Sequence, residues 1–380
     1  MYFATWVTDV QDRPDEVLSY TIAAAMLVVI LANPWIGART DHAPRRIPYL
    51  AVTTAVAVGA TALLGSLSVG WSLALYGLAL IGFNLGSVVY DAILPDVSTP
   101  QNRGRISGIG IGVGYFGSFV GVIIGRTVLD ALGLGYPALF RTLAAAFLLF
   151  AVPTFLFVRE RPRSAPADPP PSWRTAFRQL AVSWRRASQH PGLTRFLVGR
   201  FLYSDAINTM IGGFLAVFVI DEIGFERDEM EILLGGAIVG AMIGGFGGGR
   251  LVDRLGPRRV LHGALYMWMI GMGLGIVAAE ADVPELGWSL GILGGIALGT
   301  TWASDRVYMV RLSPAESIGE FYGLYGMVGR FATVLGPLTW GLIVDRLHLG
   351  RSAAVGTLIA FLVAARLVLH KVVVPEESKA

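Results

Sequence analysis

The apolar positions of this chain gather into long runs that short polar segments separate. A helix needs about 20 mostly apolar residues to cross a bilayer, because each residue advances it by only about 1.5 Å. Runs of about that length lie at 17–38, 48–67, 71–94, 105–126, 138–158, 196–219, 230–249, 259–279, 287–309, 320–343 and 352–373. The pattern therefore predicts an all-α, polytopic transmembrane helix bundle with eleven full spans.

The apolar segment 1–7 ahead of the first run is too short to cross a membrane. It lacks the basic region and the small-residue cleavage site of a signal peptide. We interpret it as the end of a helix whose beginning is absent. The first helix is then mostly missing, because the chain is truncated or its start codon is wrongly set.

Composition narrows the class of protein. The chain is 54% hydrophobic and 15% charged, whereas a soluble domain carries about 25% charged residues. This excludes a soluble enzyme, a disordered chain and a nucleic-acid-binding protein. No thiolate site exists because cysteine is absent, and the five histidines are scattered along the chain without a ligand cluster. With no zinc, Walker or nucleophile-elbow motif in a fitting context, we expect no enzyme activity, no metal and no cofactor.

Arginine placement predicts the orientation in the membrane. Arginines crowd the connections 39–47, 159–195 and 250–258, whereas 68–70 and 280–286 carry no basic residue. Basic loops face the cytoplasm. We therefore place these three loops, together with 95–104, 310–319 and the C-terminus, on the cytoplasmic side of the cell (inner) membrane. Arg346 and Arg351 on the opposite side run against the rule.

The chain repeats itself. Segment 37–46 recurs as 249–259, with its glycine and aspartate both 212 residues apart, and a second set of glycines recurs at an offset of 215. A shift of three residues across two stretches indicates two homologous halves. We predict a first half at 1–158 (five full spans and a stub), a linker at 159–193, a second half at 194–373 (six spans) and a tail at 374–380.

The linker contains an amphipathic pattern. Trp173, Phe177, Leu180 and Trp184 follow helical spacing, arginines take the other faces, and Ser172 is a candidate N-cap. Such a stripe suits a helix on the inner membrane surface, and it suits a helix packed beneath the bundle equally well.

The repeated loop has a Gly-x-x-x-Asp pattern followed by an Arg-Arg pair, after three residues in the first copy and four in the second, and this pattern has a physical rationale. Glycine lets two helices approach closely, and aspartate at a helix end can cap the N-terminus of a neighbouring helix or pair with an arginine. A contact of this kind that forms in one conformation and breaks in another would gate the movement of the two halves. The gating-motif candidates are Gly37, Asp41, Arg45, Arg46, Gly249, Asp253, Arg254, Gly256 and Arg258.

On these residues the sequence resembles the major facilitator superfamily of secondary transporters, although His42 and Pro44 depart from its loop signature in the first copy. Within the superfamily it resembles the branch of the yeast vacuolar amino-acid effluxer of autophagy and its bacterial relatives. Segments 203–209, 94–96, 103–105, 320–325 and 329–331 carry that narrower match. The resemblance implies two pseudo-symmetric six-helix halves, a monomer, and a binding site between the halves.

Ionisable residues within the spans are candidates for function, because a charge at bilayer depth costs at least a few kcal/mol. Asp205 and Arg330 both fall near mid-membrane. We expect Arg330 to bind an anionic group and Asp205 to bind a cation or carry a proton; a structural Asp–Arg pair is the alternative. The cavity candidates are Asp205, Asn208, Arg330, Asn84 and Tyr115, and the inner-gate candidates are Asp91, Asp96, Arg105, Asp305 and Arg306.

These patterns predict a secondary active transporter that moves a small polar solute by alternating access. Amino-acid efflux is the candidate activity that the resemblance implies, with a proton as candidate coupling ion and the lipid bilayer as its surroundings. The alternatives are a non-transporting membrane protein, such as a lipid-modifying enzyme or a scaffold, and an inactive truncated transporter.

Overall fold

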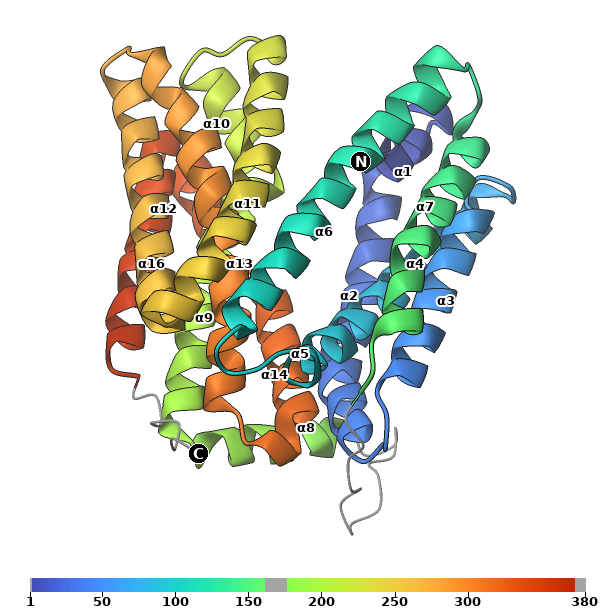
Figure 1. Ribbon diagram of the computed structural model, residues 1–380. Helices are drawn as coiled ribbons and strands as arrows, with labels where there is room; N and C mark the ends of the chain where they lie inside the picture. The colour runs from blue at the N-terminus through green and yellow to red at the C-terminus, as the bar shows by residue number, and fades with distance from the viewer. Residues whose placement is uncertain (1, 161–175, 373–380) are drawn as a thin grey trace. The chain divides into compact units, whose positions relative to one another are not determined.

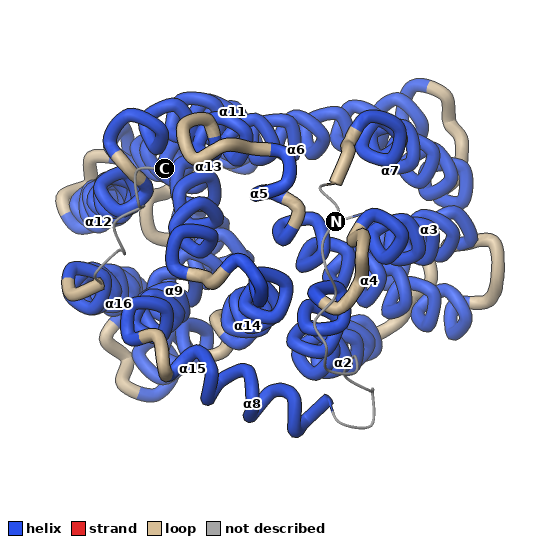
Figure 2. Tube along the Cα trace, turned by 60° about the horizontal axis from the view of Figure 1, so that its bottom comes forward, coloured by secondary structure: helices blue, strands red, loops and turns tan. Residues whose placement is uncertain are grey.

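The structure, a computed structural model, describes residues 2–160 and 176–372. Within these residues the chain forms helices and loops but no strand, as Figure 2 shows. Ten described segments, some of them built from consecutive helices, are long and apolar enough to cross a membrane. The prediction of an all-α polytopic bundle is confirmed.

The chain divides into two compact units, which we describe one at a time. The first comprises Met1–Val97, Val120–Trp184 and Ala315–Met327. In it, α4 packs against both α2 and α3, and α3 packs against α7 (Figure 1). Its helices are α1 (Tyr2–Thr5), the π-helix η1 (Trp6–Val10), α2 (Asp15–Asp41), α3 (Ile47–Leu63), α4 (Val69–Ala92), α5 (Leu94–Val97), the π-helix η2 (Thr127–Ala131) and α7 (Tyr136–Phe157).

The second unit comprises Ser98–Phe119, Arg185–Pro314 and Val328–Ala380. In it, α13 packs against α11 and α12, and α16 packs against α9 and α12. Its helices are α9 (Pro191–Thr209), the π-helix η4 (Met210–Phe214), α10 (Leu215–Asp221), α11 (Arg227–Leu255), α12 (Pro257–Glu280), the 3₁₀ helix η5 (Pro284–Gly287), α13 (Trp288–Leu312), α15 (Leu335–Gly341), the π-helix η7 (Leu342–Arg346) and α16 (Gly350–His370).

Three helices contribute residues to both units: α6 (Arg103–Arg126), α8 (Ala176–Ser188) and α14 (Ile318–Phe331). The units therefore do not coincide with the predicted sequence halves. Segment 98–119 of the first half belongs to the second unit, and segment 315–327 of the second half belongs to the first unit. The short 3₁₀ helix η6 (Ala315–Ser317) lies in this exchanged segment.

Two of the predicted spans differ from the structure. The run 48–67 forms a helix of 17 residues that ends at Leu63, because Gly65 turns the chain with a φ of 69° that favours glycine. The run 320–343 is interrupted between the end of α14 at Phe331 and the start of α15 at Leu335. Pro337 explains the break, since a proline ring clashes with the carbonyl four residues before it and lacks an N–H to bond there.

The short apolar start of the chain is helical in α1 and η1. Phe3 stacks on Tyr76 with ring centroids 4.3 Å apart, and Trp6 meets Phe140 edge-on at 6.2 Å. This aromatic cluster fixes the segment against α4 and α7.

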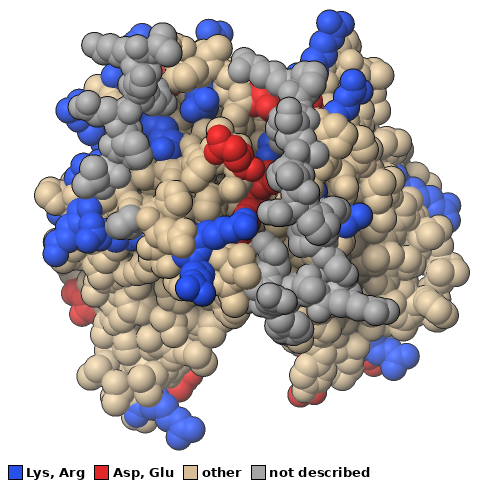
Figure 3. All heavy atoms as spheres, turned by 90° about the horizontal axis from the view of Figure 1, so that it is seen from below, with Lys and Arg blue, Asp and Glu red and all other residues tan. Residues whose placement is uncertain are grey.

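The linker helix α8 is confirmed from Ala176 onward, whereas Ser172 and Trp173 lie outside the described residues. Ser183 and Ala187 are buried, and Trp184 is 42% exposed. From residue 181 onward, the helix thus buries small side chains and leaves Trp184 exposed. Figure 3 views the molecule from the side on which α5 and α8 lie and shows Lys and Arg side chains distributed over that face.

Candidate functional site: two aspartate caps and a broken helix

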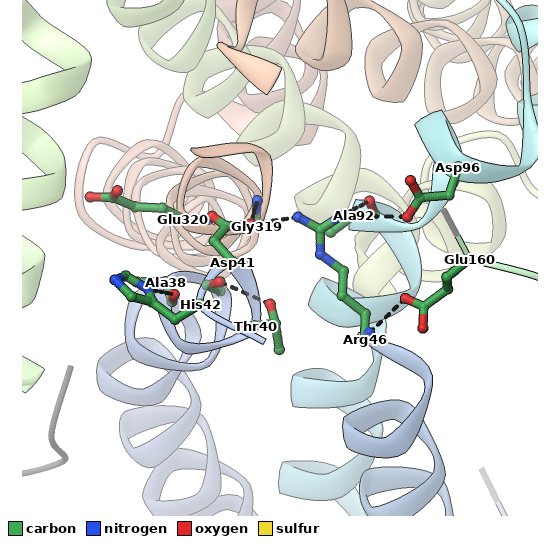
Figure 4. A network of polar contacts seen from close by, with 11 residues as sticks. Ala38, Thr40, Asp41, His42, Arg46, Ala92, Asp96, Glu160, Gly319 and Glu320 are labelled. Atoms are coloured by element: carbon green, nitrogen blue, oxygen red, sulfur yellow. Dashed lines mark hydrogen bonds and ion pairs between the residues drawn. The ribbon is translucent and has the colours of Figure 1, made fainter. Parts of the chain in front are cut away.

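Asp41 is the last residue of α2 and caps the N-terminus of α14. Its carboxylate accepts hydrogen bonds from the backbone N–H groups of Gly319 and Glu320, at 2.8 and 2.7 Å (Figure 4). The first N–H groups of a helix have no partner within the helix, and the helix dipole favours a negative charge beside them. The buried carboxylate therefore accepts hydrogen bonds from two backbone N–H groups and also balances the partial positive charge at the start of α14.

Asp253 makes the equivalent contact in the second unit. Its two carboxylate oxygens accept from the N–H groups of Gly104 and Arg105 at the start of α6, at 2.6 and 2.8 Å. The 212- and 215-residue offsets of the repeat relate the two aspartates and the two capped glycines. Each cap joins an aspartate of one sequence half to a helix of the other half, inside a single compact unit.

The motif glycines let these helices approach. A Cβ atom added to Gly249 would lie 2.5 Å from the carbonyl oxygen of Gly104 and 2.7 Å from the Cα of Gly108. One added to Gly37 would collide with the carbonyl oxygen of Gly319 in the same way. Only a residue without a side chain fits at either position.

The first cap is reinforced by charged side chains. Arg46 pairs with Asp41 at 2.5 Å, and both side chains are buried. The same guanidinium donates to the carbonyl of Ala92 at 2.7 Å and lies 3.8 Å from Asp96. The backbone N–H of Arg46 donates to the Glu160 carboxylate at 2.6 Å (Figure 4). Asp41, Arg46 and Asp96 thus form one buried network with Glu160 at its edge.

The second copy of the motif is built differently. No arginine pairs with Asp253 among the residues that the structure describes. Arg254 is exposed, and Gly256 makes the turn between α11 and α12 with a φ of 84°. Arg258 donates instead to the carbonyl of His370. In the first copy, Arg45 is likewise exposed.

The inner-gate candidates separate into the two units. Asp91 and Asp96 belong to the first, where Asp91 is half-buried and Asp96 lies near Arg46. Arg105, Asp305 and Arg306 belong to the second. Arg105 takes part through its backbone N–H, as described above, and Arg306 is only 5% exposed.

Asp305 has partners that the sequence analysis missed. Its carboxylate accepts from the guanidinium of Arg200 and from the hydroxyl of Tyr203, the latter at 3.1 Å. Arg200 also lies over the ring of Trp302, 5.6 Å from its centroid. Arg200 stands inside an apolar run, so the general rule for intramembrane charges was the signal that would have found it.

Asp205 lies at the break between α14 and α15. Its side chain is fully buried and faces the backbone N–H groups of residues 334–336 at the start of α15. Neither carboxylate oxygen forms a well-aligned hydrogen bond with them. Among the described residues, the groups that act on the Asp205 carboxylate are the backbone N–H groups of residues 334–336.

Asn208 lies one turn further along the same face of α9 and contacts the other end of the break, next to α14. Its side-chain amide donates to the carbonyl of Ala332 at 3.0 Å. Asp205 therefore lies beside the start of α15, and Asn208 lies beside the end of α14. Arg330 is half-buried in the last turn of α14.

The remaining cavity candidates lie on other helices. Asn84 is buried in α4 and donates to the carbonyl of Leu80 in its own helix at 2.7 Å. Tyr115 is half-buried on α6. Asn84 belongs to the first unit, and the other four cavity candidates belong to the second.

Comparison with known proteins supports a transporter. The chain is 27% identical to an uncharacterized transporter of the major facilitator type, YxiO of Bacillus subtilis, over 95% of this chain and 85% of the relative. It is 26% identical to autophagy-related protein 22 of Yarrowia lipolytica, over 64% of this chain but 46% of that protein. It is also 27% identical to the probable nitrate/nitrite transporter NarK2 of Mycobacterium tuberculosis, over 86% of this chain and 80% of the relative.

Solved structures give the same fold. The human organic anion transporter MFSD10 superposes with a TM-score of 0.72 at 19% identity, over 96% of this chain and 88% of that one. A bacterial homologue of the iron transporter ferroportin superposes with a TM-score of 0.70 at 17% identity, over 97% and 93%. The family model described as "Vacuole effluxer Atg22 like" matches residues 15–379. The chain therefore belongs to the Atg22-like vacuole effluxer family and is a membrane transporter of the major facilitator type.

Proposed function

We propose that this protein is a secondary active transporter that exports a small polar solute, an amino acid or a related carboxylate, across the cell membrane by alternating access. The observation that carries the proposal is the pair of equivalent aspartate caps. Each ties the end of a helix in one sequence half to the start of a helix in the other.

The caps have the right strength for a reversible contact. A capping side chain contributes about 0.5–2 kcal/mol, and two functional conformations of a protein differ by only a few kcal/mol. Movement of one sequence half against the other would break a cap at modest cost. The close glycine contacts would separate with it, since they hold the same helices together.

The solute and the coupling ion are assigned from the charged residues of the second unit. Arg330 supplies a cationic group for a carboxylate, and Asp205 supplies the exchangeable negative charge that a proton or cation would neutralise. The names of two similar proteins, a nitrate/nitrite transporter and an organic anion transporter, refer to anionic substrates. This supports an anionic group on the solute handled here.

Transport by purified protein in liposomes tests the proposal. We expect efflux of one or more radiolabelled amino acids, and loss of the ligand-induced thermal shift in Asp205→Asn and Arg330→Gln while both variants stay folded. If a variant with apolar residues in place of both Asp205 and Arg330 still binds the solute, the binding roles assigned to these two residues are refuted. Absence of transport across amino acids, sugars and nucleosides would instead favour a scaffold or a lipid-modifying enzyme.

A further inference from the structure

Two stripes of basic side chains, one of them ending in a tyrosine, meet where α12 begins and α16 ends. On α12, Arg258, His262 and Tyr266 are four residues apart and share one face, and on α16 Arg366 and His370 do the same. The two helices pack against each other and lie side by side in Figure 1. Residues more than 100 positions apart thus form one cluster, which we call the α12–α16 basic cluster.

Contacts between the stripes are direct. The guanidinium of Arg366 lies over the ring of Tyr266, 4.7 Å from its centroid. The guanidinium of Arg258 donates to the carbonyl of His370 at 2.5 Å. Arg258, Arg366 and His370 all act electrostatically on the ring of His262. The cluster is therefore a single electrostatic unit.

The cluster has no anionic partner among the described residues. None of its side chains takes part in a salt bridge there. α16 contains no acidic residue, and the one acidic residue of α12 is Glu280 at its far end. Both ring nitrogens of His262 and the Nε of Arg366 are shielded from solvent without a hydrogen-bond partner. Arg258 and Arg366 therefore carry positive charge without a carboxylate partner among the described residues.

The depth of the cluster indicates which kind of anion would pair with it. Arg258 is the second residue of its span, and Arg366 lies four residues, about 6 Å, before the end of its own. The polar interfacial layer of a bilayer is about 5–7 Å thick on each side. With the ends of these two spans at the edge of the hydrocarbon core, the guanidinium groups would lie at the level of lipid phosphates. Tyr266 is 44% exposed on the outer surface of the helix pair and adds the aromatic side chain that suits this layer.

The geometry points to a binding site for the phosphate of an anionic phospholipid headgroup, formed by Arg258, Arg366 and His370 with Tyr266 as its apolar wall and the ring of His262, whose nitrogens are shielded from solvent, behind them. Basic pockets between transmembrane helices on the cytoplasmic side bind anionic headgroups. Arginine suits this role because its planar guanidinium group can donate two parallel hydrogen bonds to two phosphate oxygens. Arg258 also belongs to the repeated loop motif, so the experiment below measures lipid binding and stability and not transport.

The full chain in nanodiscs tests the site. One set contains phosphatidylcholine alone, and a second contains phosphatidylcholine with a minority of phosphatidylglycerol. We expect phosphatidylglycerol to raise the melting temperature of the wild type, and native mass spectrometry to retain bound phosphatidylglycerol. Each arginine near an anionic surface contributes about fivefold to binding. The Arg258→Gln/Arg366→Gln double variant should therefore lose about 25-fold in lipid affinity.

Arg250→Gln is the matched control, because Arg250 is exposed on α11 and donates only to a carbonyl of its own helix. It should retain the wild-type lipid response. Equal loss in control and double variant would overturn the site, as would full lipid retention in the double variant. Arg366→Lys keeps the charge and should keep most of the lipid response, which separates lost binding from misfolding.

Two further arms distinguish other anions. Inorganic phosphate added to phosphatidylcholine nanodiscs should not reproduce the thermal shift; if it does, the site belongs to free phosphate. Glu376 and Glu377 follow α16 in the sequence. A Glu376→Gln/Glu377→Gln variant should bind phosphatidylglycerol as the wild type does. A large gain in its affinity would identify the tail as the occupant and overturn the lipid assignment.

Discussion

Two aspartates at equivalent repeat positions make the same contact in different surroundings. Both accept two backbone N–H groups at the start of a neighbouring helix. Asp41 is buried with Arg46, whereas Asp253 is half-exposed and caps its helix without an arginine partner in the described structure. The same substitution should therefore have unequal effects at the two sites.

Asp253→Asn should lower the free energy of unfolding by about 0.5–2 kcal/mol, because an amide has one oxygen to accept and turns its NH₂ toward the second backbone donor. Asp41→Asn should cost more, about 3–5 kcal/mol, since it also leaves the buried Arg46 without its counter-charge. Thermal unfolding of both variants in the same lipid measures the difference. A larger loss in Asp253→Asn would contradict this account of the two caps.

The Asp253→Asn variant also tests the role of this cap in transport. Asp253→Asn should change the ratio of inward-open to outward-open protein. It should also lower the transport rate while expression stays near normal. Unequal labelling of a reporter cysteine from the two sides of the membrane measures the proportion. An unchanged transport rate across a series of solutes would rule out gating by this residue.

At the scale of helices, close packing depends on where glycine stands within a glycine-rich segment. Gly249 touches α6 through backbone atoms, whereas an added Cβ at Gly247, two residues earlier, would meet no atom within 4 Å. The two glycines lie in the same glycine-rich part of α11. They differ in the face of the helix on which they lie.

Gly249→Ala should destabilise the protein by at least about 1–3 kcal/mol, because the new methyl group must push α6 and α11 apart. Gly247→Ala should be neutral or should stabilise by up to about 1 kcal/mol, since alanine favours a helix more than glycine does. Melting temperatures of the two single variants decide the point. Similar losses in both would mean that α6 and α11 are not in close contact.

The break between α14 and α15 offers a second test at this scale. Asn208→Ala should cost about 0.5–1.5 kcal/mol, because it leaves the Ala332 carbonyl without its donor. Asn84→Ala is the control, since Asn84 bonds only to a carbonyl of its own helix. Its substitution should cost less in the same unfolding assay. A smaller loss for Asn208→Ala than for the control would contradict the capping role of Asn208.

At the scale of the whole molecule, the orientation in the membrane can be tested directly, because the chain contains no cysteine. Single cysteines at Arg45 and Arg254 should be protected from an impermeant maleimide in intact cells, and a cysteine at Asp282 should react. All three side chains are exposed. Labelling of Arg254→Cys from outside would reverse the proposed topology.

Much of the architecture follows from sequence alone. Hydropathy over a window of about 20 residues depends only on neighbouring residues, so it locates the spans whatever the packing. The repeat is equally a property of the sequence, and it relates Asp41 to Asp253 and Gly104 to Gly319 without any knowledge of their contacts. The family resemblance was confirmed by a family match over residues 15–379.

Tertiary structure decided which groups meet. The sequence indicated that Asp253 could cap a helix, but the structure identified α6 as that helix. Arg200 pairs with Asp305 across 105 residues, and His262 and His370, which looked scattered in the sequence, belong to one cluster. Pairings of this kind depend on how distant helices pack and on which face each one turns. Local patterns of polarity carry no information about a partner in another helix, so only the folded chain reveals these contacts.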